Sequence, residues 1–284
     1  MTVAIAPQRS RHRSRLRLVL GQIGYQSVLL VRSPAGAFFA VVVPLMILVA
    51  LQFLYGQQTI EGVRSAQFFT AAMAAFAVMN VGYITTITGT VIARDEGILK
   101  RLRGTPLPPV AYIAGRIGAA ALMTAGSVTV VILVGFVIYG ISLDGSLIGV
   151  TAVTVLVGIL CFTTVGLAAT VVVASTDVAL PIAYGTLLPL CFISDVFIPS
   201  GGGPGWLTTA ASILPVKHLA DALERAFATP PGNATLNGGD LVVLAAWAAG
   251  AFTVSVLFFR WEPRPSGPGI RRRLVKLIHA AVRR

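Results

Sequence analysis

The chain has little charge. Only 11% of its 284 residues are Asp, Glu, Lys or Arg, and 56% are hydrophobic, whereas a soluble domain carries about 25% charged residues. A chain this apolar could not cover its own surface in water. The composition therefore excludes a soluble globular enzyme, a disordered protein and a free nucleic-acid-binding protein, and it indicates that the solvent is a lipid bilayer.

Side chains that carry most protein chemistry are also scarce. The two cysteines, Cys161 and Cys191, lie in apolar stretches, so a disulfide framework is excluded and we expect two buried thiols. The three histidines are scattered, and the acids form neither a metal-ligand cluster nor the paired motif that holds Mg²⁺-diphosphate. None of the three lysines follows glycine, as a phosphate loop requires. The sequence predicts no catalytic residue, no metal site and no bound ATP in this chain.

Long apolar stretches make up most of the chain. A membrane helix needs about 20 mostly apolar residues, and six stretches meet this requirement, near residues 34–55, 67–93, 112–139, 147–174, 178–197 and 241–259. The predicted fold class is an all-α integral membrane protein with six transmembrane helices.

The basic residues predict the orientation of these spans. An even number of spans places both termini on one side, and cytoplasmic segments carry an excess of Lys and Arg. If the termini are cytoplasmic, only Arg64, Lys217 and Arg225 of the 22 basic residues lie outside. In this arrangement we expect Arg116, just inside the third span, to extend towards the cytoplasmic face.

Both ends of the chain are basic. Residues 1–33 predict a cytoplasmic N-terminal region, in which 13–31 form an amphipathic helix on the membrane surface; the alternative is a solvated basic tail. In that helix Leu20 and Ile23 fall on one face, and Gln22 and Gln26 fall elsewhere. Residues 34–262 hold the six spans. Residues 263–284 predict a cytoplasmic tail whose apolar stripe among cations suits anionic membrane lipid.

The loop at 94–109 is the most informative polar segment. It predicts a short amphipathic helix that ends at Gly104, with Asp95 and Glu96 at its N-terminal end, where the helix dipole favours acids. Prolines then stiffen the return to the membrane. A stiff, charged elbow between two spans suits the transmission of force to a cytoplasmic partner. The alternative is a loop that only sets topology.

Two sequence blocks resemble a known family. The first is Glu-Gly-Ile-Leu-Lys-Arg-Leu-Arg-Gly-Thr-Pro at 96–106, and the second comprises residues 191–199, 204–207 and 214–223. Both are similar to permease subunits of type-2 ATP-binding-cassette (ABC) exporters, most of all to the daunorubicin-resistance-like branch. The resemblance runs from about residue 15 to residue 260, and 198–239 correspond to the family's outer re-entrant region. Two positions, Asp195 and Glu224, depart from what many members carry there.

The resemblance implies a multi-pass permease subunit in a bacterial plasma membrane. Two copies of a separate cytoplasmic ATPase would hold ATP and Mg²⁺, and this chain would pair with itself or with a second permease. The residues expected to couple to the ATPase are Glu96, Gly97, Leu99, Lys100, Arg101, Arg103, Thr105 and Pro106. Those expected along the substrate pathway are Pro189, Phe192, Asp195 and Phe197.

The expected cargo is an amphipathic drug or a lipid-like molecule, because the spans offer few polar groups. Two other functions stay open at this point. One is a stand-alone, proton-coupled drug efflux protein, for which Asp195 would be the only acid near membrane depth. The other is ABC export of a polysaccharide or a lipid-linked glycan.

Overall fold

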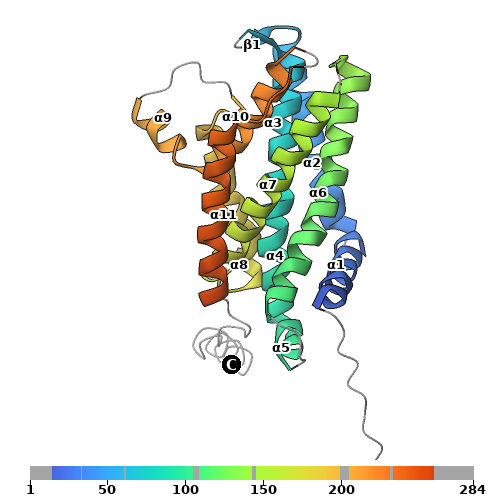
Figure 1. Cartoon of the computed structure of the whole chain (residues 1–284), viewed down its shortest axis with the longest axis vertical. Helices are drawn as coiled ribbons and strands as arrows, with labels where there is room; N and C mark the ends of the chain where they lie inside the picture. The colour runs from blue at the N-terminus through green and yellow to red at the C-terminus, as the bar shows by residue number, and fades with distance from the viewer. Residues whose placement is uncertain are drawn as a thin grey trace, which may run out of the picture.

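The computed structural model describes residues 15–32, 34–60, 62–104, 109–142, 145–198, 205–230 and 233–258. They form an elongated helical bundle (Figure 1). Its first half contains α1 (Arg15–Arg32), α2 (Pro34–Tyr55), the two-residue strands β1 (Thr59–Ile60) and β2 (Val63–Arg64), α3 (Ser65–Met79), the π-helix η1 (Asn80–Thr85), α4 (Thr86–Asp95) and α5 (Ile98–Arg103). Its second half contains α6 (Pro109–Tyr139), α7 (Gly145–Ala169), α8 (Thr176–Ile193), α9 (Gly205–Ala211), α10 (Pro215–Ala228) and α11 (Gly238–Phe258).

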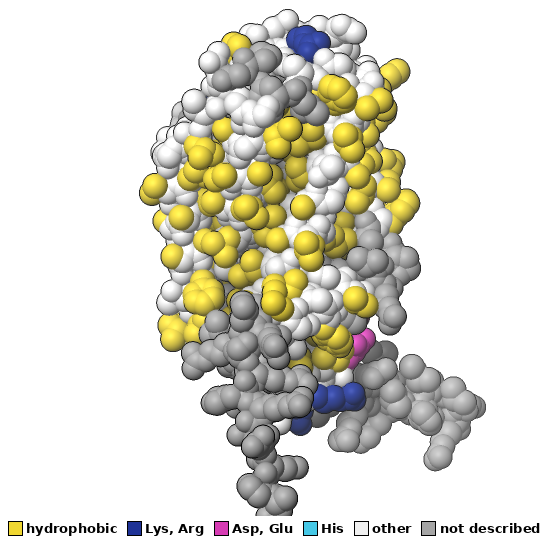
Figure 2. All heavy atoms as spheres, turned by 45° about the vertical axis from the view of Figure 1, so that its right-hand side comes forward, with side chains coloured by type: hydrophobic (Ala, Val, Ile, Leu, Met, Phe, Trp, Pro, Cys, Tyr) yellow, Lys and Arg dark blue, Asp and Glu magenta, His cyan; other side chains and the backbone are white. Residues whose placement is uncertain are grey.

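Six membrane-length helices occur among the described residues, and they coincide with the six predicted spans. They are α2, the continuous helix α3–η1–α4, α6, α7, α8 and α11. Hydrophobic side chains cover the middle of the visible face, and Lys and Arg lie towards its two ends (Figure 2). The chain is therefore an all-α, six-span membrane protein, as predicted.

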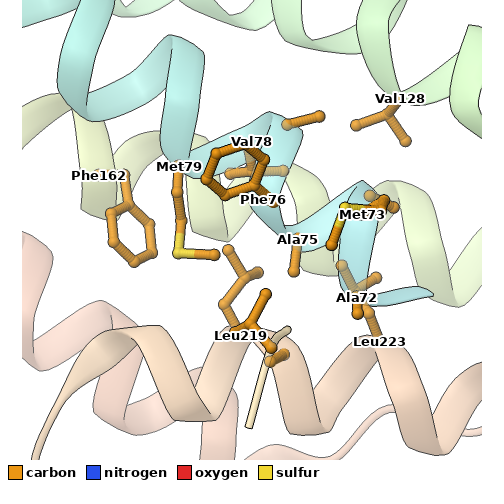
Figure 3. Packing of buried hydrophobic residues seen from close by; sticks show 14 of the residues in the cluster. Ala72, Met73, Ala75, Phe76, Val78, Met79, Val128, Phe162, Leu219 and Leu223 are labelled. Carbon is orange, nitrogen blue, oxygen red and sulfur yellow. The ribbon is translucent and has the colours of Figure 1, made fainter. Parts of the chain in front are cut away.

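The second span is the centre of the bundle. Small residues dominate α3, where Ala71, Ala72, Ala74, Ala75 and Ala77 are all fully buried. Because alanine lets helices approach closely, α2, α6, α7 and α10 all contact this helix. Figure 3 shows its larger side chains together with Val128 of α6, Phe162 of α7 and Leu219 of α10.

The π-helix η1 interrupts the central span where it lies close to α7. A Cβ atom placed on Gly82 would lie 2.9 Å from Phe162 Cβ, and one placed on Gly166 would lie 3.0 Å from the Gly82 carbonyl oxygen. The Asn80 side chain donates to the Phe39 carbonyl of α2 at 3.3 Å. Contacts to α2 and α7 therefore hold the π-turn in place, and such turns occur frequently at functional sites.

Arg116 lies in a different place from the one predicted. Its side chain does not extend to the membrane surface but is buried, and its Nη2 donates to the carbonyl oxygens of Thr85, at 2.6 Å, and Thr86, at 3.4 Å. These two carbonyls lie at the junction between η1 and α4, where the hydrogen-bonding pattern changes from π to α. Backbone acceptors inside the bundle have no water to bind, so a guanidinium from α6 satisfies them.

The helix α1 confirms the predicted helical N-terminal segment, but its buried face differs from the sequence pattern. Leu20 is 57% exposed, whereas Gln26 is 4% exposed and donates to the Tyr112 carbonyl at 3.3 Å. The reason is the surface of α6, where Gly115 and Gly118 let α1 approach closely. The predicted lipid-binding stripe at 270–281 lies outside the described residues.

The two ends of the bundle differ in structure. The elbow helix α5 lies at one end, together with the start of α8 and the end of α11, while β1–β2, α9 and α10 lie at the other (Figure 1). At this second end Arg64 donates to the Gly140 carbonyl at 3.1 Å and so joins the hairpin to the α6–α7 turn. The end of the bundle with α5 is called the α5 end below, and the opposite end is called the α10 end.

The contact at Gly82 leads to a stability prediction. Gly82→Ala forces a methyl group against Phe162 and should lower the free energy of unfolding by about 1–3 kcal/mol, as overpacking does elsewhere. Gly149→Ala in α7 is the control, because nothing lies within 4 Å of a Cβ atom there. Thermal unfolding of the detergent-solubilised protein measures both. Equal melting temperatures for the two variants would contradict the close packing at η1.

Candidate functional site

The α5 elbow begins at a left-handed residue. Gly97 precedes α5 with φ +71°, and its carbonyl accepts the amide of Arg101 at 3.1 Å. L-residues with a side chain seldom adopt this conformation. Glycine therefore lets the chain turn sharply from α4 into α5, and α5 is followed by Gly104, where the sequence predicted its end.

One buried side chain anchors α5. Leu99 is fully buried and packs with Tyr112, Ile113 and Leu167 in a small cluster apart from the main core. Glu96, Lys100 and Arg101 are exposed. The elbow therefore presents a charged face while its apolar face packs against α6 and α7. Of the other predicted coupling residues, Arg103 is the last residue of α5, and Thr105 and Pro106 lie outside the described residues.

Arg94, which precedes Asp95 and Glu96, is deeply buried. Arg94 is 2% exposed, and its guanidinium donates to three backbone carbonyls of the turn that directly follows α7: those of Thr170 (3.1 Å), Val173 (2.8 Å) and Ala174 (3.2 Å). A cation is favoured there because carbonyls at a helix C-terminus carry partial negative charge. In the sequence, Arg94 is only one of the basic residues that predict the topology, since nothing local indicates distant carbonyl partners.

Asp95 lies at the N-terminus of a different helix from the predicted one, which was the short helix of the 94–109 loop. It is the last residue of α4, and its Oδ2 accepts both the backbone N–H and the hydroxyl of Thr176, each at 2.8 Å. Thr176 is the first residue of α8, and the preceding Ser175 makes no side-chain cap. Asp95 therefore caps α8 rather than α5. The sequence predicted a favourable interaction of this carboxylate with a helix N-terminus, but it assigned the interaction to α5 instead of α8.

A chain of ion pairs crosses the α10 end. Lys217 of α10 lies 3.1 Å from Asp195, which follows α8, and 3.6 Å from Asp221. Asp221 in turn lies 3.4 Å from Arg225, one turn further along α10. Asp195, at one of the two positions where the sequence differs from many family members, is therefore paired with a cation of α10. The pair joins the end of α8 to α10.

The same network reaches α11 through a buried acid. The Asp240 carboxylate is 7% exposed and lies 2.6 Å from Arg225 Nη1 and 2.7 Å from His218 Nδ1. His218 Nε2 lies 2.8 Å from the Ser212 carbonyl oxygen. The imidazole of His218 therefore lies between the buried carboxylate of α11 and a backbone carbonyl, which are both hydrogen-bond acceptors.

Burial and charge act against each other on two members of this network. Burial by itself lowers the pKa of Lys217, but the neighbouring carboxylates of Asp221 and Asp195 outweigh it and raise the pKa above its ordinary value. For Asp221, burial raises the pKa more than Lys217 and Arg225 lower it. Since lysine is cationic below its pKa, Lys217 keeps its charge at neutral pH.

The predicted pathway residues lie around the end of α8. Pro189 is inside α8, and Phe192 is half-exposed. The ring of Phe197 is buried, with its centroid 5.1 Å from that of Phe192 and 5.2 Å from that of Phe76. Asp195 adopts φ +62°. The structure packs Phe192 against Phe197, whereas Asp195 pairs with Lys217; the role of the four residues in transport stays a prediction.

Beside the ion pairs is a pocket of about 260 Å³. Its apolar wall comes from β2, α3 and α10, and its polar wall comes from α10; the lining residues are Val63, Phe68, Lys217, Asp221, Glu224, Arg225 and Ala228. The lining pairs apolar surface with charge of both signs.

Two comparisons with known proteins agree with this architecture. The family description "ABC-2 type transporter" matches residues 23–227, which include the elbow and α10. The daunorubicin resistance ABC transporter permease protein DrrB1 of Streptomyces coeruleorubidus is 25% identical over 187 residues. That alignment covers 64% of this chain and 65% of DrrB1, slightly less than two thirds of the relative's length.

The buried acid of α11 can be tested directly. Asp240→Asn keeps the shape of the side chain but removes the charge that Arg225 and His218 share, so the free energy of unfolding should fall by about 1.5–3 kcal/mol, the range for a hydrogen bond to a charged group. Asp177→Asn, an exposed acid at the opposite end of the bundle, is the matched control. Thermal unfolding in detergent compares them, and an unchanged Asp240→Asn protein would show that the network adds nothing to stability.

Proposed function

The chain belongs to the ABC-2 type transporter family, and from this premise we propose that it is the transmembrane permease subunit of an ATP-driven exporter in a bacterial plasma membrane. The observation that carries the proposal is the elbow: a short helix fixed by buried Leu99, turned at a left-handed glycine and presenting Glu96, Lys100 and Arg101 to the surroundings. Such a charged, rigid projection suits docking to a separate protein.

The positions of the charges support a cytoplasmic α5 end. Lys100, Arg101 and Arg103 belong to α5, whereas Arg64, Lys217 and Arg225 all belong to the α10 end. Cytoplasmic loops carry the excess of basic residues. With this orientation the elbow projects into the cytoplasm, both termini are cytoplasmic, and the ion-pair network faces the exterior.

The proposed partner is a cytoplasmic ABC ATPase that supplies the energy. Two ATPase copies would bind ATP and Mg²⁺, and this chain would dimerise with a second copy or with a homologous permease. Closure of the ATPase pair would push on the elbow, through the contact residues proposed from the sequence, Glu96 to Pro106. A transporter driven in this way works by shifting a population between inward-open and outward-open states.

The proposed cargo is an amphipathic drug or a lipid-like molecule leaving the cytoplasm or the inner leaflet. Two observations support it: apolar surface predominates on the spans (Figure 2), and the name of the related DrrB1 refers to daunorubicin resistance. The pathway proposed from the sequence includes Pro189, Phe192 and Asp195, which lie at or near the outer end of α8.

Inverted membrane vesicles test the assignment. Vesicles containing the chain and its cognate ATPase should accumulate daunorubicin, used here as the fluorescent probe, only when ATP is added. Vesicles containing the chain alone should neither accumulate it nor hydrolyse ATP above background. Accumulation by the chain alone, abolished when the proton gradient is collapsed, would contradict the proposal and support a secondary transporter.

The turn at Gly97 gives a prediction about coupling. A side chain in the left-handed conformation costs about 1–2 kcal/mol, or about five- to thirtyfold in an equilibrium. Gly97→Val should therefore reorient α5 and lower drug export per ATP hydrolysed by a factor in that range. Gly97→Asn is the matched control, because asparagine tolerates this conformation. Vesicle export normalised to membrane protein measures both, and full activity of Gly97→Val would exclude a role for the elbow's shape.

A further inference from the structure

The helix α8 packs on the bundle along one narrow stripe, where the Tyr83 hydroxyl of η1 also lies 3.0 Å from Thr186 Oγ1, and it has charged contacts at both ends. Only Ala179, Ala183, Leu187 and Cys191, four residues apart on a single stripe, are buried. Exposed apolar side chains such as Leu180 and Ile182 cover other parts of its surface. By contrast, α7 packs against α6, α10, α11 and η1 and buries much more of its surface. Of the two helices that meet at the α7–α8 turn, α8 is the one that buries less of its surface in the bundle.

At the α5 end, two adjacent residues hold both sides of that turn. Arg94 binds carbonyls of the turn, beginning with Thr170 directly after α7, and Asp95 caps the first amide of α8. Each charge has the sign that its helix terminus favours: a cation at the carbonyl end and an anion at the amide end. Both residues belong to the last turn of α4, directly before the elbow.

At the α10 end, α8 is followed by a second carboxylate contact. Asp195 lies two residues beyond the last residue of α8 and pairs with Lys217 of α10 at 3.1 Å. Lys217 belongs to the network that continues through Asp221 and Arg225 to α11. A helix that is buried along one stripe and has a charged contact at each end can transmit a displacement from one end of the bundle to the other.

We propose that Arg94 and Asp95 form a clasp that passes movement of the α5 elbow to α8, and through the Asp195–Lys217 pair to α10 at the opposite end. The clasp rests on the proposed function, since it concerns how movement started by the ATPase crosses the membrane. Arg94 and Asp95 are positioning residues: they touch neither cargo nor nucleotide, and they set which helix follows the elbow.

Two variants open the clasp in different ways. Asp95→Ala removes the carboxylate. Thr176→Pro removes both donors that Asp95 uses, the amide and the hydroxyl, while proline is well tolerated as the first residue of a helix and the preceding Ser175 is already extended. Asp177→Ala is the matched control, because it removes an exposed acid from the same first turn of α8.

Distances between nitroxide labels report the movement. One label pair, on Gly104→Cys and Leu160→Cys, follows the end of α5 relative to α7; the other, on Leu180→Cys and Val256→Cys, follows α8 relative to α11. Cys161 and Cys191 are buried. The labelling reagent therefore reacts with the introduced cysteines and not with these two. The protein is reconstituted with its cognate ATPase in lipid nanodiscs, and double electron–electron resonance is recorded with and without a non-hydrolysable ATP analogue.

In the parental complex, the analogue should shift both distances. With the clasp open, the α5–α7 distance should still shift, but the α8–α11 shift should be largely lost, and export per ATP hydrolysed should fall by about two- to thirtyfold, the range over which mutations change coupling between sites. Asp177→Ala should behave like the parent. A purely structural cap would lower thermal stability in the two clasp variants without separating the two distances.

The outcomes distinguish the clasp from the function on which it rests. If the α5–α7 distance does not respond to the analogue in the parental complex, the proposed coupling fails and the clasp fails with it. If α5 moves and the α8–α11 shift persists in both Asp95→Ala and Thr176→Pro, the clasp alone is overturned. Should Asp95→Ala fail to fold, Thr176→Pro decides the matter, because it leaves Asp95 in place.

Discussion

Backbone polar groups inside this bundle must find partners among its own side chains, since hydrocarbon supplies none. The constraint is most visible where helices deviate from regularity. Arg116 binds the carbonyls at the end of the π-helix, Asn80 binds a carbonyl of α2, and Ser127 of α6 donates to the Ala40 carbonyl at 2.7 Å. Each of these bonds joins two different helices. Satisfying the backbone therefore also determines which helices lie together.

In the part of the chain that the structure describes, two arginines are buried between the spans, and both serve this purpose. Arg94 and Arg116 each bind backbone carbonyls of another helix or turn. A guanidinium has several donors in a fixed plane and stays charged, so one side chain can satisfy two or three carbonyls at once. These bonds involve the η1 and α4 parts of the central helix. The α3 part, which is rich in alanine, packs against α10.

The sequence predicted the spans and the all-helical fold well because length and apolar composition are local properties. The six predicted segments match α2, α3–η1–α4, α6, α7, α8 and α11 closely. Asp95, Arg116 and Gln26 were assigned to the wrong surroundings, because the carbonyls and amides that they bind lie 30 or more residues away. The ion pairs of His218 and Arg225 with Asp240 were missed for the same reason: separations of 22 and 15 residues leave no periodic signal.

The π-helix also determines the direction in which the side chains of α4 point around the axis of the second span. A π-turn accommodates one more residue than an α-turn, and each residue of an α-helix advances the side chains by about 100°. Residues after Thr85 are therefore rotated relative to an uninterrupted helix, which brings Arg94 to the side where α7 ends. An insertion or deletion of one residue in η1 would leave the hydropathy profile almost unchanged and yet turn Arg94 and Asp95 away from α7 and α8. Chain length between residues 80 and 85 is thus as restricted as residue type, and length variation among related proteins should be tolerated in the loops before it is tolerated here.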